Sequence, residues 1–251
     1  MAGHLTLTQP LVVEFVGLPG VGKSHATRLV AARLAAVGTP ARSSALRINH
    51  ELGRSRRVLY KSGICAMEAL GRPGRAAKVG RALIGSGQQS RVDVLRLLYN
   101  WLFLVGLLRR ARNRPVVELL DEGIYQLLWS IGFAGDERVI PDYSSTFLVG
   151  PPSAAVPLPD VVVVVEAPLG LIQARLASRK ARAGRLDRME AAERQAALVR
   201  GADLLDKLLS ENVGLGGELS GPLLRRVRNG GSGQLEADVA ALVDELASLA
   251  E

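Results

Sequence analysis

The sequence contains little of what stabilises small secreted proteins. Its 251 residues include a single cysteine, Cys65, so the chain has no internal disulfide bond, and a lone cysteine is typical of a reducing compartment. Aromatic residues make up only 4% of the chain, so the core must be packed mainly from Ala, Val and Leu. The first ten residues have no basic segment followed by a long apolar one, which argues against a secretory signal. We expect a cytoplasmic protein in which Cys65 is a packing residue.

Acidic residues are scarce in one part of the chain, which leaves a strongly basic block there. Residues 53–114 contain 14 Lys and Arg against only Glu68 and Asp93, a balance of +12, whereas the whole chain carries +8. The remaining residues therefore sum to −4, the difference between these two values. Such a block can bind phosphorylated substrates, nucleic acid or an anionic membrane surface, or it can be a set of solvated helix faces.

No apolar run is long enough to cross a bilayer. The most apolar segment lies within residues 92–112, and its uncharged centre extends only from Leu97 to Leu108, between Arg96 and the cluster at 109–112. A membrane-spanning helix needs about 18 or more apolar residues. We therefore predict a buried core helix or a helix at the interface of a homodimer, with contact to a membrane surface as a weaker alternative.

What the sequence does contain is a phosphate-binding motif near its amino end. Residues 17–24 read Gly-Leu-Pro-Gly-Val-Gly-Lys-Ser, the Gly-x-x-x-x-Gly-Lys-Ser pattern of the Walker A loop, and they stand between an apolar run and a helical pattern. The glycines let successive N–H groups turn inward around a phosphate chain, and the following helix directs its positive end at the same anion. Lys23 is expected to reach the β- and γ-phosphates and Ser24 to bind Mg²⁺. The loop predicts binding of ATP and Mg²⁺; the alternative is a Gly-rich turn that binds nothing.

Strand-like and helix-like segments alternate along the chain, which predicts an α/β fold. Five segments favour strands: residues 11–16, 42–48, 115–120, 159–166 and 222–227. The consecutive valines of 161–165 are typical of a strand buried on both faces, as in a parallel sheet. Residues 51–89 hold several short helical patches separated by glycines. We predict one domain comprising residues 1–251, with a five-stranded parallel sheet and helices on both faces.

An acidic pair follows the third predicted strand. Asp121, Glu122 and Gly123 come directly after residues 115–120, and such folds bind ligands beyond the carboxyl ends of their strands. Asp121 at this place can hold Mg²⁺ or accept the proton of an attacking hydroxyl, and Glu122 could serve instead. Asp121 could also be a helix N-cap that has no catalytic role.

Four arginines spaced three residues apart follow the fourth predicted strand: Arg179, Arg182, Arg185 and Arg188. On one helix, residues three apart drift slowly around the axis, so the four guanidinium groups would share a broad face. If they converge on a γ-phosphoryl group, they would stabilise the charge on its oxygens. The alternative is a solvated basic helix end.

The order of these motifs resembles that of the thymidylate kinase-like branch of the P-loop nucleoside and nucleotide kinases. The resemblance is strongest over residues 159–190, which contain Pro-Asp-(Val)₅-Glu-Ala-Pro and, at 185–190, Arg-Leu-Asp-Arg-Met-Glu. It extends over nearly the whole chain and is weak over 53–114. It implies a P-loop kinase fold with a mobile Arg-rich lid at 178–192 and a helical acceptor side at 50–114.

The resemblance also implies a set of site residues. Asp121 takes the place of the family's acidic residue at the tip of the third strand, and the 229–233 turn is expected beside the adenine. The catalytic residues would be Lys23, Asp121, Glu122 and the four arginines, and the metal ligands Ser24 and Asp121. The nucleotide would be bound by Gly17, Leu18, Pro19, Gly20, Val21, Gly22, Lys23, Ser24, His25, Asn229, Gly230, Gly231 and Ser232.

Two features depart from the family pattern. The family usually has an arginine after the acidic residue, where it grips the acceptor phosphate, whereas this chain has Glu122 and Gly123. The family's phosphate loop commonly carries an acidic residue or an arginine near its middle, where this one has residues 18–21, Leu-Pro-Gly-Val. An anionic Glu122 would repel a phosphate and would suit a hydroxyl acceptor instead.

These observations predict an ATP-dependent small-molecule kinase that transfers the γ-phosphoryl group to a nucleoside, a nucleotide or a related acceptor. One alternative is a P-loop ATPase or switch that acts on a protein partner. The chain has no Asn-Lys-x-Asp motif for guanine, which counts against a GTPase. A second alternative is a nucleic-acid-associated ATPase that uses the 53–114 block. Few aromatic residues are interleaved with that block, Tyr60, Tyr99 and Trp101 among them, which argues against a surface for stacking bases.

Overall fold

A parallel sheet lies at the centre of the molecule. The computed structural model describes residues 9–136, 147–148, 155–179, 184, 186–213, 221–231 and 233–250. Within these ranges five strands pair in parallel, in the order β2-β3-β1-β4-β5. Their bounds are β1 Leu11–Val16, β2 Ala41–Arg42, β3 Val117–Leu120, β4 Val161–Glu166 and β5 Leu223–Arg228. The predicted five-stranded parallel sheet is confirmed.

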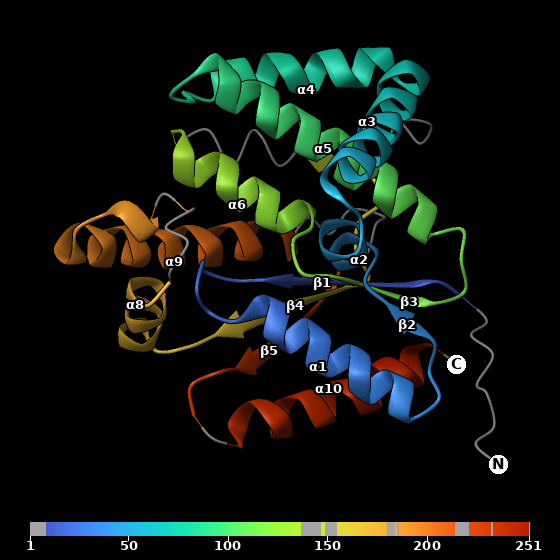
Figure 1. Cartoon of the computed structure of the whole chain (residues 1–251), viewed down its shortest axis with the longest axis vertical. Helices are drawn as coiled ribbons and strands as arrows, with labels where there is room; N and C mark the ends of the chain where they lie inside the picture. Colours follow the sequence, from blue (N-terminus) through green and yellow to red (C-terminus); the bar gives the residue numbers. More distant parts are fainter. Residues whose placement is uncertain are drawn as a thin grey trace.

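Helices cover both faces of this sheet (Figure 1). Helices α1 and α10 lie on one face, whereas α5 and α6 lie on the other, with α3 and α4 packed outside α5. The long helices are α1 Lys23–Ala36, α3 Arg54–Gly71, α4 Pro73–Gly85, α5 Arg91–Ala111, α6 Ile124–Ala134, α8 Leu169–Ala177, α9 Ala191–Val213 and α10 Gln234–Ala250. Among the described residues, none of the helices could span a membrane.

The central strands are buried on both faces, which explains their continuous apolar sequences. All six residues of β1 are buried, and so are the five valines at 161–165 of β4. A strand covered by helices on both sides has no face in contact with solvent, so its sequence does not alternate between apolar and polar residues. Glu14 is the one charged residue of β1, and it is fully buried.

The predicted strand at 42–48 is wrong beyond Arg42. The strand stops there, and helix α2 (Ser44–His50) begins instead. Glu118, on the neighbouring strand β3, accepts hydrogen bonds from the backbone N–H of Ser44 at 2.6 Å and from its hydroxyl at 2.9 Å. Its carboxylate therefore stabilises the amino end of α2, where unpaired N–H groups favour an anion.

The helical patches predicted over 51–89 are the two helices α3 and α4. Gly71 and Gly85 end these helices, as the glycine pattern suggested, whereas Gly80 lies within α4 without interrupting it. Added Cβ atoms at Gly63 and Gly74 would meet nothing within 4 Å, so these glycines interrupt no packing. Gly106 of α5 has a different role: a Cβ there would lie 2.5 Å from Cγ2 of Ile64, so the glycine lets α3 approach α5 closely. Residues 101–108 of α5 are buried, as expected for a core helix.

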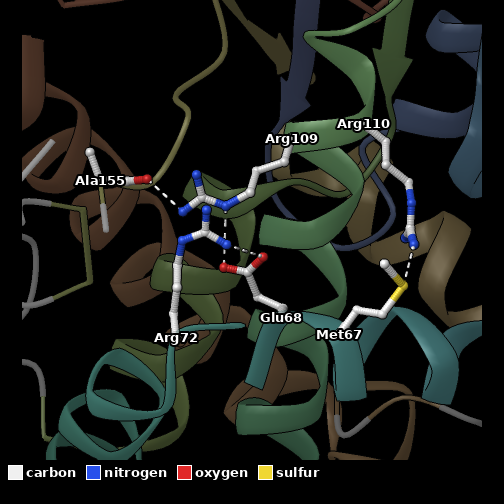
Figure 2. A network of polar contacts seen from close by, with 6 residues as sticks. All are labelled: Met67, Glu68, Arg72, Arg109, Arg110 and Ala155. Carbon is white, nitrogen blue, oxygen red and sulfur yellow. Dashed lines mark hydrogen bonds and ion pairs between the residues drawn. The ribbon is translucent and has the colours of Figure 1, made fainter. Parts of the chain in front are cut away.

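Part of the basic block is neutralised inside the fold. Figure 2 shows Arg72 and Arg109 converging on the carboxylate of Glu68, at 3.4 and 3.2 Å. Arg109 also donates to the carbonyl oxygen of Ala155 at 2.7 Å. Glu68 is only 5% exposed, so this network joins α3, α5 and the segment before β4 from within.

Candidate active site

The phosphate loop connects β1 to α1 in the conformation that its glycines permit. Gly20 and Gly22 have φ angles of 90° and 103°, in the left-handed region that favours glycine. A Cβ at Gly22 would lie 2.2 Å from Nδ2 of Asn229, so only glycine fits against that side chain. No side chain caps the amino end of α1, which leaves its N–H groups to bind an anion.

Lys23 folds back onto the loop. Its Nζ donates to the carbonyl oxygen of Gly17 at 2.8 Å and reaches that of Leu18 at 3.4 Å. Burial lowers the pKa of Lys23 from 10.5 to about 8, although the Glu122 and Asp121 carboxylates partly oppose this shift. A triphosphate would give the ammonium group stronger partners than these carbonyl oxygens.

Two oxygen ligands suited to Mg²⁺ lie side by side at the loop. The hydroxyl of Ser24 donates to Oδ2 of Asp121 at 3.0 Å, and Asp121 comes directly after β3 with 8% of its surface exposed. Hydroxyl and carboxylate oxygens are what Mg²⁺ prefers, with phosphate and water completing the shell. No cluster of three or more acidic, His or Cys residues that could hold a metal occurs in the described part of the chain. The Ser24 hydroxyl and the Asp121 carboxylate fit a Mg²⁺ ion whose other ligands would be phosphate and water oxygens.

Gly123, which follows the acidic pair of Asp121 and Glu122, lies against the buried carboxyl group of Glu14. Burial raises the pKa of Glu122, while the cation of Lys23 opposes this shift. A Cβ at Gly123 would lie 2.4 Å from Oε2 of Glu14, so glycine is required where the chain crosses that side chain. Glu14 accepts a hydrogen bond from the backbone N–H of Gln126 at 2.8 Å, in the first turn of α6. Burial raises the pKa of Glu14 from 4.5 to about 8, against the opposing effect of backbone N–H groups of residues 123–126.

A cavity of about 570 Å³ brings the loop and the acidic pair together. One side of the cavity is formed by the phosphate loop and by Arg175 and Arg179. Its opposite side is formed by α3, α5 and α6, which contribute apolar and polar side chains: Lys61, Leu97, Asn100, Phe103, Leu104, Leu127 and Ser130. The volume lies within the range of roughly 300–1,000 Å³ that small-molecule sites occupy.

Comparison of the sequence with protein-family models and with curated proteins gives no significant match. Solved structures are similar in fold. The deoxyadenosine kinase from M. mycoides with dCMP and dCDP bound has a TM-score of 0.53 at 10% identity, with 95% of this chain and 100% of that chain covered. The same enzyme with dATP has a TM-score of 0.51 at 11% identity, with 94% and 100% covered. Thymidylate kinase from Candida albicans has a TM-score of 0.50 at 16% identity, with 96% and 91% covered.

The chain has the P-loop nucleoside and nucleotide kinase fold. In this P-loop kinase fold the predicted site residues occupy three kinds of position. Those that line the cavity are Pro19, Gly20, Gly22, Lys23, Ser24, His25, Asp121, Glu122 and Arg179. Gly17, Leu18 and Val21 belong to the loop but do not line the cavity, and neither do Gly230 and Gly231. Arg182, Arg185 and Ser232 lie outside the described residues.

The four arginines do not share one helix. Helix α8 ends at Ala177, before Arg179, and residues 186–188 form a separate 3-10 turn. Arg179 lines the cavity and lies 3.7 Å from Oδ1 of the buried Asp187. Arg188 is exposed and lines a different hollow, beside Gln88 and Asp93. Arg179 and Arg188 therefore do not share a helix face, because α8 ends before the segment begins and Arg188 belongs to a separate turn.

Three side chains that shape the candidate site were missed by the sequence reasoning: Glu14, Gln126 and Arg175. Arg175 donates to the carbonyl oxygen of Val21 at 2.9 Å, and Asn229 donates to the same oxygen at 2.7 Å. Asn229 therefore holds the phosphate loop, and its place beside the adenine stays a prediction. The available signals were a charge inside an apolar strand for Glu14 and a basic residue in the Ala- and Leu-rich helix α8 for Arg175. Gln126 had no comparable signal.

Proposed function

We propose that the protein is an ATP- and Mg²⁺-dependent kinase that transfers the γ-phosphoryl group to a nucleoside, a nucleotide or a related small acceptor. The observation that carries this proposal is the single cavity in which Lys23, Ser24, Asp121 and Glu122 meet, with room for a second molecule beyond them. The fold shared with a deoxyadenosine kinase and a thymidylate kinase supports the same reaction class.

The chemistry would be mainly positioning and charge neutralisation. In the reaction, an oxygen of the acceptor bonds to the γ-phosphorus, the bond to the β,γ-bridging oxygen breaks, and ADP leaves with that electron pair. Asp121 or Glu122 would accept the proton of an attacking hydroxyl. Lys23 would leave its carbonyl partners to donate to the phosphates. Mg²⁺ held by Ser24 and Asp121 would neutralise charge on the phosphate oxygens.

The acceptor would occupy the side of the cavity formed by residues 50–114 and α6. Leu97, Phe103 and Leu104 offer an apolar wall, and the Asn100 amide offers a donor and an acceptor. Lys61 Nζ lies 4.7 Å from the centre of the Phe103 ring. Glu122 favours a hydroxyl acceptor over a phosphate, which distinguishes this site from one specific for thymidylate. Residues 178–192, with Arg179 at the cavity, would act as the lid.

A homodimer through the helix at 92–112 would have to use its first turns. Residues 101–108 are buried in the core, whereas Val92 and Leu95 are 63% and 65% exposed. Light scattering on the purified protein and on its Leu95→Glu variant would measure the oligomeric state. We expect the mass of a dimer for the wild type and that of a monomer for the variant.

The experiment that tests the proposed function is a screen for ADP release with ATP and Mg²⁺ over nucleosides, nucleotides, sugars and amino alcohols. Lys23→Ala is the matched control, and it should lose at least about 100-fold in turnover because its ammonium group would stabilise charge on the transferred group. Its circular dichroism and melting temperature should stay close to those of the wild type. Acceptor-dependent ADP release that Lys23→Ala leaves unchanged would contradict the proposal, and so would its absence from the whole screen.

A further inference from the structure

Gln126 is held at both its backbone and its side chain at the floor of the cavity. Its backbone N–H donates to Glu14 at 2.8 Å, and its Oε1 accepts from the backbone N–H of Gly17 at 3.1 Å. The residue is 6% exposed and lines the cavity in the first turn of α6, four residues after Glu122. A residue fixed at its backbone and at the end of its side chain loses little further freedom when a ligand arrives.

These bonds determine which way the amide points. The N–H of Gly17 can only donate, so the oxygen of the Gln126 amide must face it, and the NH₂ group must face away. Within the described residues, Nε2 of Gln126 has no hydrogen-bond partner. A buried amide with its oxygen satisfied and its two N–H donors directed to a cavity is arranged to bind an oxygen atom there.

The position of Gly17 indicates which oxygen that is. Gln126 binds the N–H of Gly17, and Lys23 binds the carbonyl oxygen of the same residue at 2.8 Å. Gln126 and Lys23, which is expected at the γ-phosphate, are therefore both bound to Gly17, and both line the cavity together with Asp121 and Glu122. Two anionic carboxylates so close to the transferred group would oppose the build-up of charge on it, and a fixed neutral donor offsets that effect.

We infer that Gln126 is a catalytic residue whose Nε2 donates a hydrogen bond to an equatorial oxygen of the transferring γ-phosphoryl group. This inference rests on the proposed function. The hydrogen bond changes no bond order: the acceptor oxygen bonds to phosphorus, the bond to the bridging oxygen breaks, and the acceptor proton goes to Asp121 or Glu122. Gln126 stabilises the charge on the group in flight while its other end keeps Gly17 in place.

Two substitutions separate this donor role from a purely structural one. Gln126→Glu has the same shape and can still accept the hydrogen bond from the N–H of Gly17, but it has no N–H donor. Gln126→Met has neither the donor nor the acceptor, and it adds no charge. Gln195→Glu is the matched control, because Gln195 is exposed on α9 and lines a separate hollow. We expect both Gln126 variants to lose about 100-fold in turnover, with MgADP affinity unchanged, and Gln195→Glu to match the wild type.

A structural role gives a different pattern, in which Gln126→Glu turns over at the wild-type rate or Gln126→Met loses MgADP affinity together with turnover. Either result overturns the inference. A second measurement needs no acceptor: calorimetric titration of MgADP with aluminium fluoride, which mimics the phosphoryl group in flight. Both Gln126 variants should bind this complex at least about tenfold more weakly than the wild type does, and unchanged binding refutes the donor. If the wild type releases no ADP with any acceptor, the proposed function fails, and this binding measurement still decides the role of Gln126.

Discussion

Glu14 allows the sharpest test of how this site is built. The carboxyl is fully buried beneath Gly123, and its pKa rises from 4.5 to about 8 because burial disfavours the ionised form. A group whose pKa is higher in the folded chain than in the unfolded one binds its proton more tightly when folded. Its contribution to stability is therefore complete below pH 4.5 and is lost as the pH rises towards 8.

The size of this loss follows from the two pKa values. A tenfold change in proton affinity corresponds to about 1.4 kcal/mol, so between pH 5 and pH 8 Glu14 should lower the free energy of unfolding by about 3–4 kcal/mol. The side-chain amide of the Glu14→Gln variant cannot ionise, but its oxygen can still accept from the N–H of Gln126. The NH₂ group of that amide would stand where Oε2 has no partner now, at a cost of about 1–3 kcal/mol that does not depend on pH.

The assay is urea unfolding of the wild type and Glu14→Gln at pH 5, 6, 7 and 8. The useful quantity is the difference between the two free energies of unfolding, since the other titrating groups cancel in it. We expect this difference to move in favour of the variant by about 3–4 kcal/mol as the pH rises from 5 to 8. A difference that stays constant over this range would refute the reasoning, because Glu14 would then titrate alike in the folded and unfolded chains.

Two further substitutions test the acidic pair. Asp121→Asn should lower the turnover by about 100-fold or more while it weakens ATP binding far less, because the carboxylate acts on the reacting groups; equal losses in the two quantities would favour a capping role. Gly123→Ala should destabilise the protein by about 1–3 kcal/mol, since its Cβ would lie 2.3 Å from Cδ of the buried Glu14. Gly63→Ala, which meets nothing within 4 Å in helix α3, is its control and should stabilise by up to about 1 kcal/mol. Equal thermal midpoints for the two alanine variants would show that the Gly123 contact is relieved without cost.

The fold could be predicted wherever local sequence decides the structure. The apolar runs of β1, β3 and β4 identify strands because both of their faces are buried, and the glycine pattern of 17–24 identifies the phosphate loop. The second strand could not be bounded correctly, because its end depends on Glu118, which lies 74 residues away from Ser44 in sequence. The glycine pattern within 51–89 placed the ends of α3 and α4 at Gly71 and Gly85 correctly, but it also suggested a break at Gly80, where α4, packed against α5, is continuous.

The candidate site shows the same division. Lys23, Ser24 and Asp121 were predictable because each belongs to a short motif or to a strand end. Gln126 and Arg175 were not, since their roles depend on bonds to Gly17 and Val21 over 109 and 154 residues. Such contacts leave no periodicity in the sequence.

The bond between Asn229 and Val21 has a consequence for how the protein is made. It spans 208 residues, and with Arg175 it fixes the carbonyl oxygen at the bend of the phosphate loop. A ribosome-bound chain that has emerged only as far as β4 would contain the whole Walker motif. It would still lack Arg175 and Asn229, the two side chains that hold the loop at Val21. Nucleotide affinity would then appear late in synthesis, once β5 has added to the edge of the sheet.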